Sequence, residues 1–332
     1  MGQLENGTWI ANAPLARMKG GAFDRPASTF RNWVTPDGAP GPSGEGGFPA
    51  QPWRYHLYVS YACPWAHRTL IVRALKGLDP QIGISVVHPE MLEDGWSFRT
   101  DFNGATGDQI HGLPFLRDLY VRSDPQATTK VTVPVLWDRE REVIVSNESA
   151  EIIRMLTSAW DALGAEPLDL WPEPLRDDIE AVNARVYDTV NNGVYRAGFA
   201  KTQGAYEDAA HALFDTLDWL EARLTHQRYL MGDRLTEADI RLFTTLIRFD
   251  TVYHGHFKCN RRKLIEYPAL WAYTRELYQM PGVAETVFLD HIAHHYYFSH
   301  DAINPTRIVP IGPRLDLGAP HGREGLGGES RP

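Results

Sequence analysis

The feature that most constrains the fold is a strand–helix–strand unit between residues 54 and 89. The stretch "RYHLYVS" (54–60) has the pattern of a buried strand, Pro64 opens a helix that continues to about Leu75, and "IGISVVHP" (82–89) is a second strand. Strands joined by a helical crossover pair in parallel. The sequence therefore predicts a parallel βαβ unit, with "SYACPWAHR" (60–68) where the first strand passes into the helix.

Further strands follow an irregular stretch at residues 92–128. The segments "VTVPVLWD" (131–138) and "EVIVSN" (142–147) predict a hairpin, and "ESAEIIRML" (148–156) predicts the next helix. The order β-α-β, long connection, β-β-α is the thioredoxin-like order.

After residue 161 only helical patterns occur. They cover residues 173–192, 206–226, 236–253, 260–280 and 281–295. Thr236 and Asp239 predict a variant of the capping box at the start of the third of these helices.

The fold class that follows is an α/β thioredoxin-like N-terminal domain followed by an all-α C-terminal domain. We expect an irregular N-terminal arm (1–50), the thioredoxin-like domain (51–160), the all-helical domain (161–313) and a tail (314–332). The tail is rich in Gly and Pro, so we expect it to be disordered.

Composition excludes several classes of function. The net charge of -9 argues against a nucleic-acid partner, and no apolar run is long enough to cross a membrane. The start of the chain lacks a signal-peptide pattern, and two cysteines make no disulfide framework. We therefore expect a cytoplasmic protein.

Cys63 lies at a position that favours reactivity. Pro64 suits the first helical position, which makes Cys63 the N-cap residue. Unpaired amide groups and the helix dipole stabilise a thiolate there, and the thiolate is the nucleophile. The alternative is a small buried apolar residue, which is the usual role of a free cysteine.

The surroundings of Cys63 limit its chemistry. Ala66 stands where a dithiol enzyme carries its second cysteine, and Cys259 lies in the other domain. A single thiol that attacks sulfur forms a mixed disulfide, and an outside thiol must release it. In a cytoplasm that thiol is glutathione.

Other residues are consistent with a glutathione site, although each has a plainer explanation. Pro134 interrupts a strand, as a cis proline or an edge-strand proline would. Glu148 and Ser149 begin a helix and suit the ammonium and a carboxylate of glutathione, or simple capping. Lys130 suits a second carboxylate or plain solvation, and Trp96 suits the lining of a site within the irregular stretch.

The motifs named so far, with "LTEADIRLF" and "YPALWAYTRELYQMPGVAET", resemble those of cytosolic glutathione S-transferases. Four of the motifs resemble those of one branch, the Xi class or glutathionyl-hydroquinone reductases. These are "CPWAHR", "VTVPVLWD", "NESAEIIRML" and "HHYYFSHDAINPTRIVPIGP". The resemblance covers roughly residues 30–313.

The resemblance implies the site residues. The catalytic cysteine corresponds to Cys63, a tyrosine of the helical domain to Tyr195, and two tyrosines near the sulfur to Tyr253 and Tyr296. The implied glutathione contacts are Trp96, Lys130, Val131, Thr132, Val133, Glu148 and Ser149. The family usually has Arg where this chain has Lys130, and Lys lacks the fork that binds a carboxylate through two bonds.

The implied activity is the reduction of glutathionyl-hydroquinones to hydroquinones, with oxidised glutathione as the second product. Glutathione is a co-substrate; no permanent cofactor, metal, nucleic acid or membrane is expected, and the family suggests a homodimer.

Three alternatives remain open: an omega-like thioltransferase or dehydroascorbate reductase, a metal protein, and a non-catalytic scaffold. The metal alternative rests on His291, His294, His295 and His300, together with His254 and His256.

Overall fold

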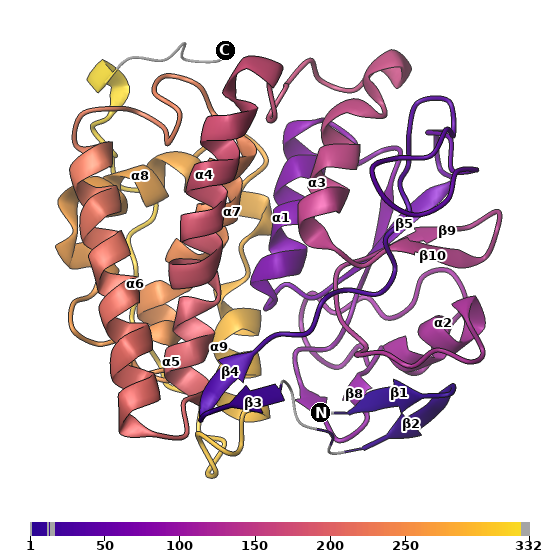
Figure 1. Ribbon diagram of the computed structural model, residues 1–332, viewed down its shortest axis with the longest axis horizontal. Coiled ribbons are helices and arrows are strands. Elements are labelled where there is room, and N and C mark those ends of the chain that lie inside the picture. The colour runs from indigo at the N-terminus through magenta and orange to yellow at the C-terminus, as the bar shows by residue number, and fades with distance from the viewer. Residues whose placement is uncertain (1, 12, 14–16, 327–332) are drawn as a thin grey trace. The chain divides into compact units, whose positions relative to one another are not determined.

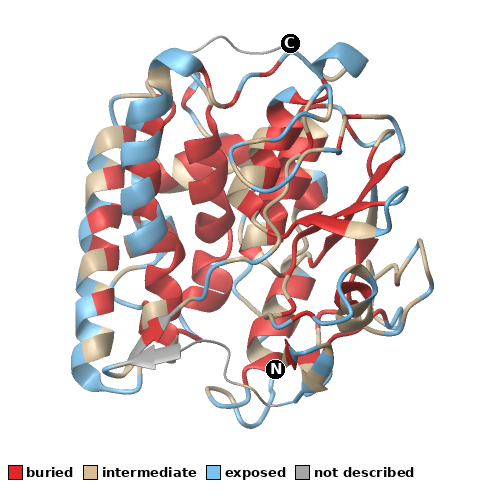
Figure 2. Cartoon of the chain, turned by 45° about the vertical axis from the view of Figure 1, so that its right-hand side comes forward, coloured by how far each residue is buried: buried red, intermediate tan, exposed pale blue. Residues whose placement is uncertain are grey.

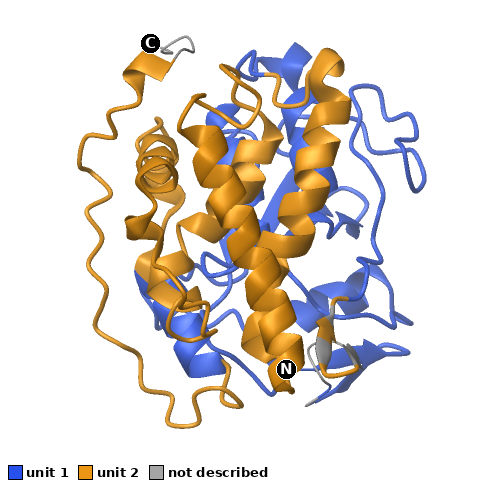
Figure 3. Cartoon of the chain, turned by 60° about the vertical axis from the view of Figure 1, so that its left-hand side comes forward, with its two compact units in different colours: residues 1–16, 26–168, 290–299 blue, residues 17–25, 169–289, 300–332 orange. Residues whose placement is uncertain are grey.

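The computed structural model describes residues 2–11, 13 and 17–326, and it divides into two compact units. Figure 3 colours them separately: the first comprises Met1–Ala16, Pro26–Leu168 and Asp290–Ser299, and the second comprises Arg17–Arg25, Asp169–Leu289 and His300–Pro332. These units differ from the expected domains in three short segments, of which the first is residues 161–168, part of the first unit. Residues 290–299 belong to the first unit, and residues 17–25 belong to the second.

A four-stranded sheet in the order β10-β9-β5-β6 forms the centre of the first unit (Figure 1). The strands are β5 (Tyr55–Val59), β6 (Gly83–Val86), β9 (Val135–Asp138) and β10 (Val143–Ser146). β6 pairs with β5 in parallel, and β9 is antiparallel to both β5 and β10. The predicted βαβ unit and hairpin are therefore confirmed.

Helices α1 (Pro64–Leu75) and α3 (Ser149–Ser158) pack against each other beside this sheet (Figure 1). Every residue of β5 is buried. This is why its apolar run continues on both faces instead of alternating.

The stretch 92–128, expected to be irregular, contains regular structure. It includes the end of a short hairpin, β7 (Met91–Leu92) with β8 (Gly95–Trp96), and helix α2 (Leu116–Ser123). In α2, Leu116, Leu119 and Tyr120 are buried at helical spacing. Asp118 accepts a hydrogen bond from the Phe115 amide and so caps the helix. The Gly, Asp and Pro residues around α2 hid this short pattern.

The N-terminal arm also contains strands. β1 (Gln3–Glu5) pairs with β2 (Thr8–Ile10), and β3 (Arg17–Lys19) pairs with β4 (Ala22–Asp24). Leu4 of β1 bridges to Thr129, which brings the arm next to Lys130 within the first unit.

Helices form the second unit. They are α4 (Arg176–Val186), α5 (Gly193–Phe199), α6 (Gln203–Leu224), α7 (Glu237–Leu246) and α8 (Pro268–Tyr278). Two π-helical turns, η3 (Tyr187–Asn191) and η4 (Phe249–Tyr253), extend α4 and α7. Helix α9 (Leu289–Ser299) follows, with nearly all of its residues in the first unit. The capping box of Thr236 and Asp239 is present, because Asp239 accepts from the Thr236 amide at 2.9 Å.

Two predicted helices have different bounds. In the segment 260–280 a 3₁₀ turn occupies Leu264–Glu266, and the α-helix starts only at Pro268, since a proline fits the first helical position but not the interior. The segment 281–295 begins with a 3₁₀ turn at Ala284–Thr286, and α9 itself starts at Leu289.

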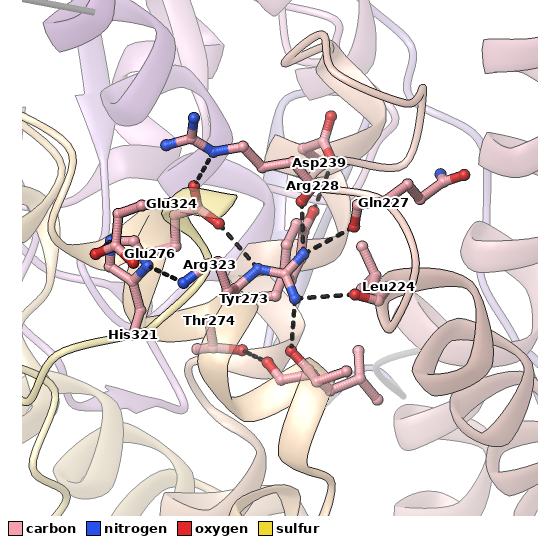
Figure 4. A network of polar contacts seen from close by, with 12 residues as sticks. Leu224, Gln227, Arg228, Asp239, Tyr273, Thr274, Glu276, His321, Arg323 and Glu324 are labelled. Atoms are coloured by element: carbon pink, nitrogen blue, oxygen red, sulfur yellow. Dashed lines mark hydrogen bonds and ion pairs between the residues drawn. The ribbon is translucent and has the colours of Figure 1, made fainter. Parts of the chain in front are cut away.

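The sequence predicts a C-terminal tail that is disordered from residue 314. Residues 314–326 instead pack on the rest of the second unit. Leu317 is buried, and the Arg323 side chain is 3% exposed. Figure 4 shows the Arg323 guanidinium among its partners, which include Glu276 and the carbonyl oxygens of Leu224 and Gln227. The remaining predicted tail residues, 327–332, lie outside the described residues.

Burial follows this arrangement. In Figure 2 the strands of the sheet and the inner faces of the helices are mostly buried, while exposed residues collect on the outer helix faces and loops. Among the described residues, no helix has the length and apolar character needed to cross a membrane.

Candidate active site

Cys63 is the N-cap residue of α1, as predicted. It lies between β5 and Pro64 with extended backbone dihedrals (φ -77°, ψ 121°), and its carbonyl accepts the amide of His67 at 3.0 Å. Its side chain is half-buried, and Sγ donates to the Val133 carbonyl oxygen at 3.6 Å. The structure thus brings two of the predicted site residues together.

The second cysteine has a different environment. Cys259 of the second unit is fully buried, and burial raises the pKa of its thiol. A buried, protonated thiol is a poor nucleophile. Burial therefore disfavours Cys259 as the nucleophile.

The segment before β9 lies beside Cys63. The Val133–Pro134 peptide bond is cis, which is one of the two explanations that the sequence offered for this proline. The neighbouring Thr132 is held by Tyr120, whose hydroxyl donates to the Thr132 carbonyl at 2.8 Å. Asn147 donates to the same hydroxyl at 3.1 Å, and so links this segment to the start of α3.

Glu148 and Ser149 form the N-terminus of α3. One carboxylate oxygen of Glu148 caps the helix by accepting the Ala150 amide at 3.1 Å, and the other accepts the Ser28 hydroxyl at 2.9 Å. The capping alternative is thus present in the structure. Glu148 directly follows Asn147, which contacts the segment before β9 through Tyr120.

Arg68 is a residue that the sequence analysis did not single out. Its side chain is 1% exposed, and Nη1 donates to the Ser149 hydroxyl at 3.4 Å. A buried cation next to a helix N-terminus favours an anionic group at that place. The available signal was an arginine in the first turns of the helix, five residues after Cys63.

Lys130 is half-buried, and the loss of hydration lowers the pKa of its ammonium group. Glu5 of β1 acts in the opposite direction by charge attraction. The N-terminal hairpin therefore contributes a carboxylate to the surroundings of this lysine.

Trp96 ends β8 and is 5% exposed, and Tyr296 of α9 is 1% exposed. Both belong to the same unit as Cys63.

Tyr195 and Tyr253 belong to the second unit, where they take part in a group of aromatic rings. Their ring centroids lie 6.1 Å apart, and Phe257 contacts both, at 5.4 Å from Tyr195 and 5.6 Å from Tyr253. Phe23 stacks on Tyr195 at 6.1 Å. Tyr253 and Phe257 are fully buried and Tyr195 is nearly so, and these rings pack on one another.

Arg25 adds a cation to this group, which the sequence did not indicate. Its guanidinium carbon lies 4.9 Å from the centroid of the Tyr195 ring, and Nε donates to the Asn192 side chain at 3.0 Å. Because residue 25 is distant in sequence from residue 195, only the folded unit brings them together.

The histidines of the metal alternative contact protein groups. His291 and His295 bond the carbonyl oxygens of Asn103 and Pro89, and His294 meets Glu90. Within residues 2–11, 13 and 17–326, no group of three or more His, Cys, Asp or Glu side chains could hold a metal ion.

Comparison with known proteins places this site in a family. The family model "Glutathione S-transferase, N-terminal domain" matches residues 62–159, and "Glutathione S-transferase, C-terminal domain" matches residues 203–276. These two ranges correspond to the thioredoxin-like and helical parts described above.

Individual relatives are similar over nearly their whole length. Glutathionyl-hydroquinone reductase YqjG of Escherichia coli strain K12 is 57% identical over 98% of this chain and 99% of its own. Its glutathione-bound structure matches with a TM-score of 0.90 and 55% identity, covering 97% of this chain and 99% of that chain. Glutathionyl-hydroquinone reductase PcpF of Sphingobium chlorophenolicum is 50% identical over 96% of this chain and 98% of its own.

A third similar protein is a Xi class glutathione S-transferase from Natrialba magadii, with a TM-score of 0.90 and 49% identity over 99% of this chain and 98% of that chain. The chain belongs to the glutathione S-transferase family and, within it, to the Xi class of glutathionyl-hydroquinone reductases.

Proposed function

We propose that the protein reduces S-glutathionyl-hydroquinones with glutathione. One glutathionyl-hydroquinone and one glutathione give one hydroquinone and one oxidised glutathione. The observation that carries the proposal is the half-buried Cys63 thiol at the N-terminus of α1, 3.6 Å from the Val133 carbonyl, in a chain of this family. The proposed reaction uses the side chains of the protein and the two substrates, and no further reductant.

In the first half-reaction the Cys63 thiolate attacks the sulfur of the glutathionyl group. A sulfur–sulfur bond forms, and the bond between sulfur and the aromatic carbon breaks with its electron pair moving to that carbon. The carbon then takes a proton, for which we propose the Tyr195 hydroxyl as donor. Hydroquinone leaves, and Cys63 carries a mixed disulfide with glutathione.

In the second half-reaction the thiolate of a second glutathione attacks the glutathionyl sulfur of the mixed disulfide. Oxidised glutathione leaves, and the electron pair returns to Cys63 as a thiolate. The proton released by glutathione restores the Tyr195 hydroxyl. The cycle thus closes without another reductant.

The binding roles follow from the chemistry of glutathione, an extended peptide with two carboxylates and one ammonium. We propose that Glu148 binds the ammonium and that Ser149, beside Arg68, receives one carboxylate. The remaining proposed contacts are Trp96, Lys130, Val131, Thr132 and Val133. We further propose that Tyr253 and Tyr296 donate hydrogen bonds that stabilise the Cys63 thiolate.

We propose that the aromatic group of the second unit binds the flat ring of the hydroquinone. The rings of Tyr195, Tyr253 and Phe257 lie at stacking and edge-to-face distances from one another. A hydroquinone ring fits such an environment because it stacks on apolar faces while its hydroxyls form hydrogen bonds.

The same cysteine would also serve an omega-like thioltransferase, whose substrate is a mixed disulfide. Steady-state turnover separates the two functions. Supplied with glutathione, the protein should convert a glutathionyl-hydroquinone with one oxidised glutathione formed per hydroquinone, and with a higher kcat/KM than for a glutathione mixed disulfide of similar size. Turnover of the mixed disulfide alone would favour the thioltransferase.

We also propose a cytoplasmic homodimer. Sedimentation velocity of the purified full chain would test the assembly, with a single species of twice the chain mass expected.

A further inference from the structure

Helix α9 brings a histidine onto the indole of Trp96. The ring centroids of His295 and Trp96 lie 4.8 Å apart with an interplanar angle of 23°, so the rings are stacked. His295 is 6% exposed and Trp96 is 5% exposed. The two rings therefore pack with little access of water, although they lie about 200 residues apart in the sequence.

A hydrogen bond fixes the imidazole of His295. Its Nδ1 lies 2.8 Å from the carbonyl oxygen of Pro89. Because a carbonyl oxygen only accepts, Nδ1 carries the proton and the ring cannot rotate without losing this bond. The imidazole is thus oriented by the segment that leads into the hairpin of Trp96.

The same helix holds the other strand of that hairpin. The Ser299 hydroxyl accepts the amide of Met91 at 3.0 Å, and Met91 is the strand partner of Trp96. One helical turn before His295, His291 bonds the Asn103 carbonyl at 2.6 Å and meets the Tyr61 ring edge-on at 5.3 Å. Because Tyr61 lies two residues before Cys63, α9 connects the Trp96 hairpin with the segment that leads to the nucleophile.

We infer that His295 is a positioning residue: it holds the Trp96 indole in the orientation that binds glutathione. This inference rests on the proposed role of Trp96 as a glutathione contact. His295 itself touches no substrate in this account. Residues 290–299 belong to the same compact unit as Trp96 and Cys63 (Figure 3).

The test uses three variants that separate the stacking of His295 on Trp96 from its hydrogen bond to Pro89; the imidazole also lies edge-on to the Tyr296 ring at 5.4 Å. His295→Phe keeps a stacking ring but removes the donor, His295→Asn keeps a donor near the place of Nδ1 but removes most of the stacking, and His295→Ala removes both. For His295→Ala we expect the KM for glutathione to rise roughly fivefold, as the loss of an aromatic contact and a buried hydrogen bond suggests. The kcat should stay within about twofold, and the other two variants should give smaller increases in KM.

His294→Ala is the matched control. It truncates the adjacent residue of the same helix, whose Nε2 meets Glu90 at 3.0 Å and not Trp96. We expect a smaller change in KM than for His295→Ala. Circular dichroism monitors folding, and the Phe and Asn variants carry the test if the Ala variant does not fold.

Trp96→Phe separates the inference from the function on which it rests. If His295 acts through Trp96, then His295→Ala should add little to the KM of Trp96→Phe. An unchanged KM in all three His295 variants, a loss confined to kcat, or additive effects of the two changes would overturn the inference. If Trp96→Phe itself leaves the KM unchanged, the proposed glutathione contact is wrong and the inference falls with it, while turnover of the glutathionyl-hydroquinone still tests the reaction.

Discussion

If the Tyr195 hydroxyl is the proton donor, its loss should affect a carbon leaving group more than a sulfur leaving group. When the substrate is a mixed disulfide, the leaving group is a thiolate, which needs little help from an acid. When the substrate is a glutathionyl-hydroquinone, the leaving group is the aromatic carbon, which must take up a proton. Tyr195→Phe removes one oxygen and keeps the ring that packs on Phe23 and Phe257. We expect kcat to fall by about 10²-fold or more with a glutathionyl-hydroquinone, and by little with a glutathione mixed disulfide.

Steady-state kinetics with both substrates checks this prediction, and Tyr278→Phe in α8 is the matched control. Equal losses on the two substrates would show that Tyr195 is not the proton donor.

Variants of Lys130 test whether a lysine ammonium binds the glutathione carboxylate at the position where the family usually has arginine. If its ammonium binds a carboxylate of glutathione, Lys130→Ala should raise the KM for glutathione roughly tenfold, the loss expected for a charge-assisted hydrogen bond, with a smaller effect on kcat. Lys130→Arg should retain or improve binding, because the guanidinium fork fits a carboxylate. Lys201→Ala, at an exposed lysine of the second unit, is the control. Unchanged kinetics in both Lys130 variants would mean that Lys130 does not bind the substrate.

At the scale of the elements, the pairing of β5 with β6 encloses a histidine. His56 is 4% exposed, its Nε2 lies 2.8 Å from the Ser85 hydroxyl, and burial lowers its pKa from 6.5 to about 4. Between these two values the unfolded chain binds a proton that the folded chain does not. The free energy of unfolding should therefore fall as the pH falls below about 6.5, by about 2 kcal/mol at pH 5 from this group.

Urea unfolding between pH 7 and pH 5 measures this slope. His56→Gln should make it shallower, while His226→Gln at an exposed histidine should leave it unchanged. The same slope in the wild type and in His56→Gln would show that His56 does not contribute to it.

The elements show how far a sequence determines this fold. The β5–α1–β6 unit could be predicted because its strands are short segments rich in aromatic and β-branched residues and Pro64 marks the helix start. Helix α2 could not, because its eight residues are too few for the periodic pattern to stand out among Gly and Pro. Cys63 was evident from its place between strand and helix, whereas Arg25 and His295 depend on contacts between distant segments that local pattern does not contain.

At the scale of the whole molecule, the C-terminal tail is attached through Arg323. Its guanidinium donates to Glu276 of α8 and to the Leu224 carbonyl at the end of α6, each at 2.9 Å, and to the Arg228 carbonyl at 2.7 Å (Figure 4). A cation at a helix C-terminus satisfies carbonyls that have no helical partner. The Gly- and Pro-rich composition of the tail predicted disorder because composition does not show which tail residues, such as Leu317 and Arg323, pack on the second unit.

Arg323→Ala should lower the free energy of unfolding by about 3 kcal/mol, because it removes one of the two guanidinium groups that pair with the buried Glu276 carboxylate, the other being Arg228, and a donor to several carbonyl groups. Arg323→Lys should cause a smaller loss, since it retains the charge but not the fork. Thermal and urea unfolding check both, with Arg314→Ala at an exposed arginine of the same tail as control. Equal stability of Arg323→Ala and the control would contradict the attachment.

The central claim is that Cys63 takes the glutathionyl group from the substrate. The most direct measurement is the intact mass of the protein after mixing with one equivalent of a glutathionyl-hydroquinone in the absence of free glutathione. We expect one glutathionyl group on the wild type and on Cys259→Ser, none on Cys63→Ser, and release of one hydroquinone per adduct. Hydroquinone release without an adduct, or an adduct that persists in Cys63→Ser, would contradict it.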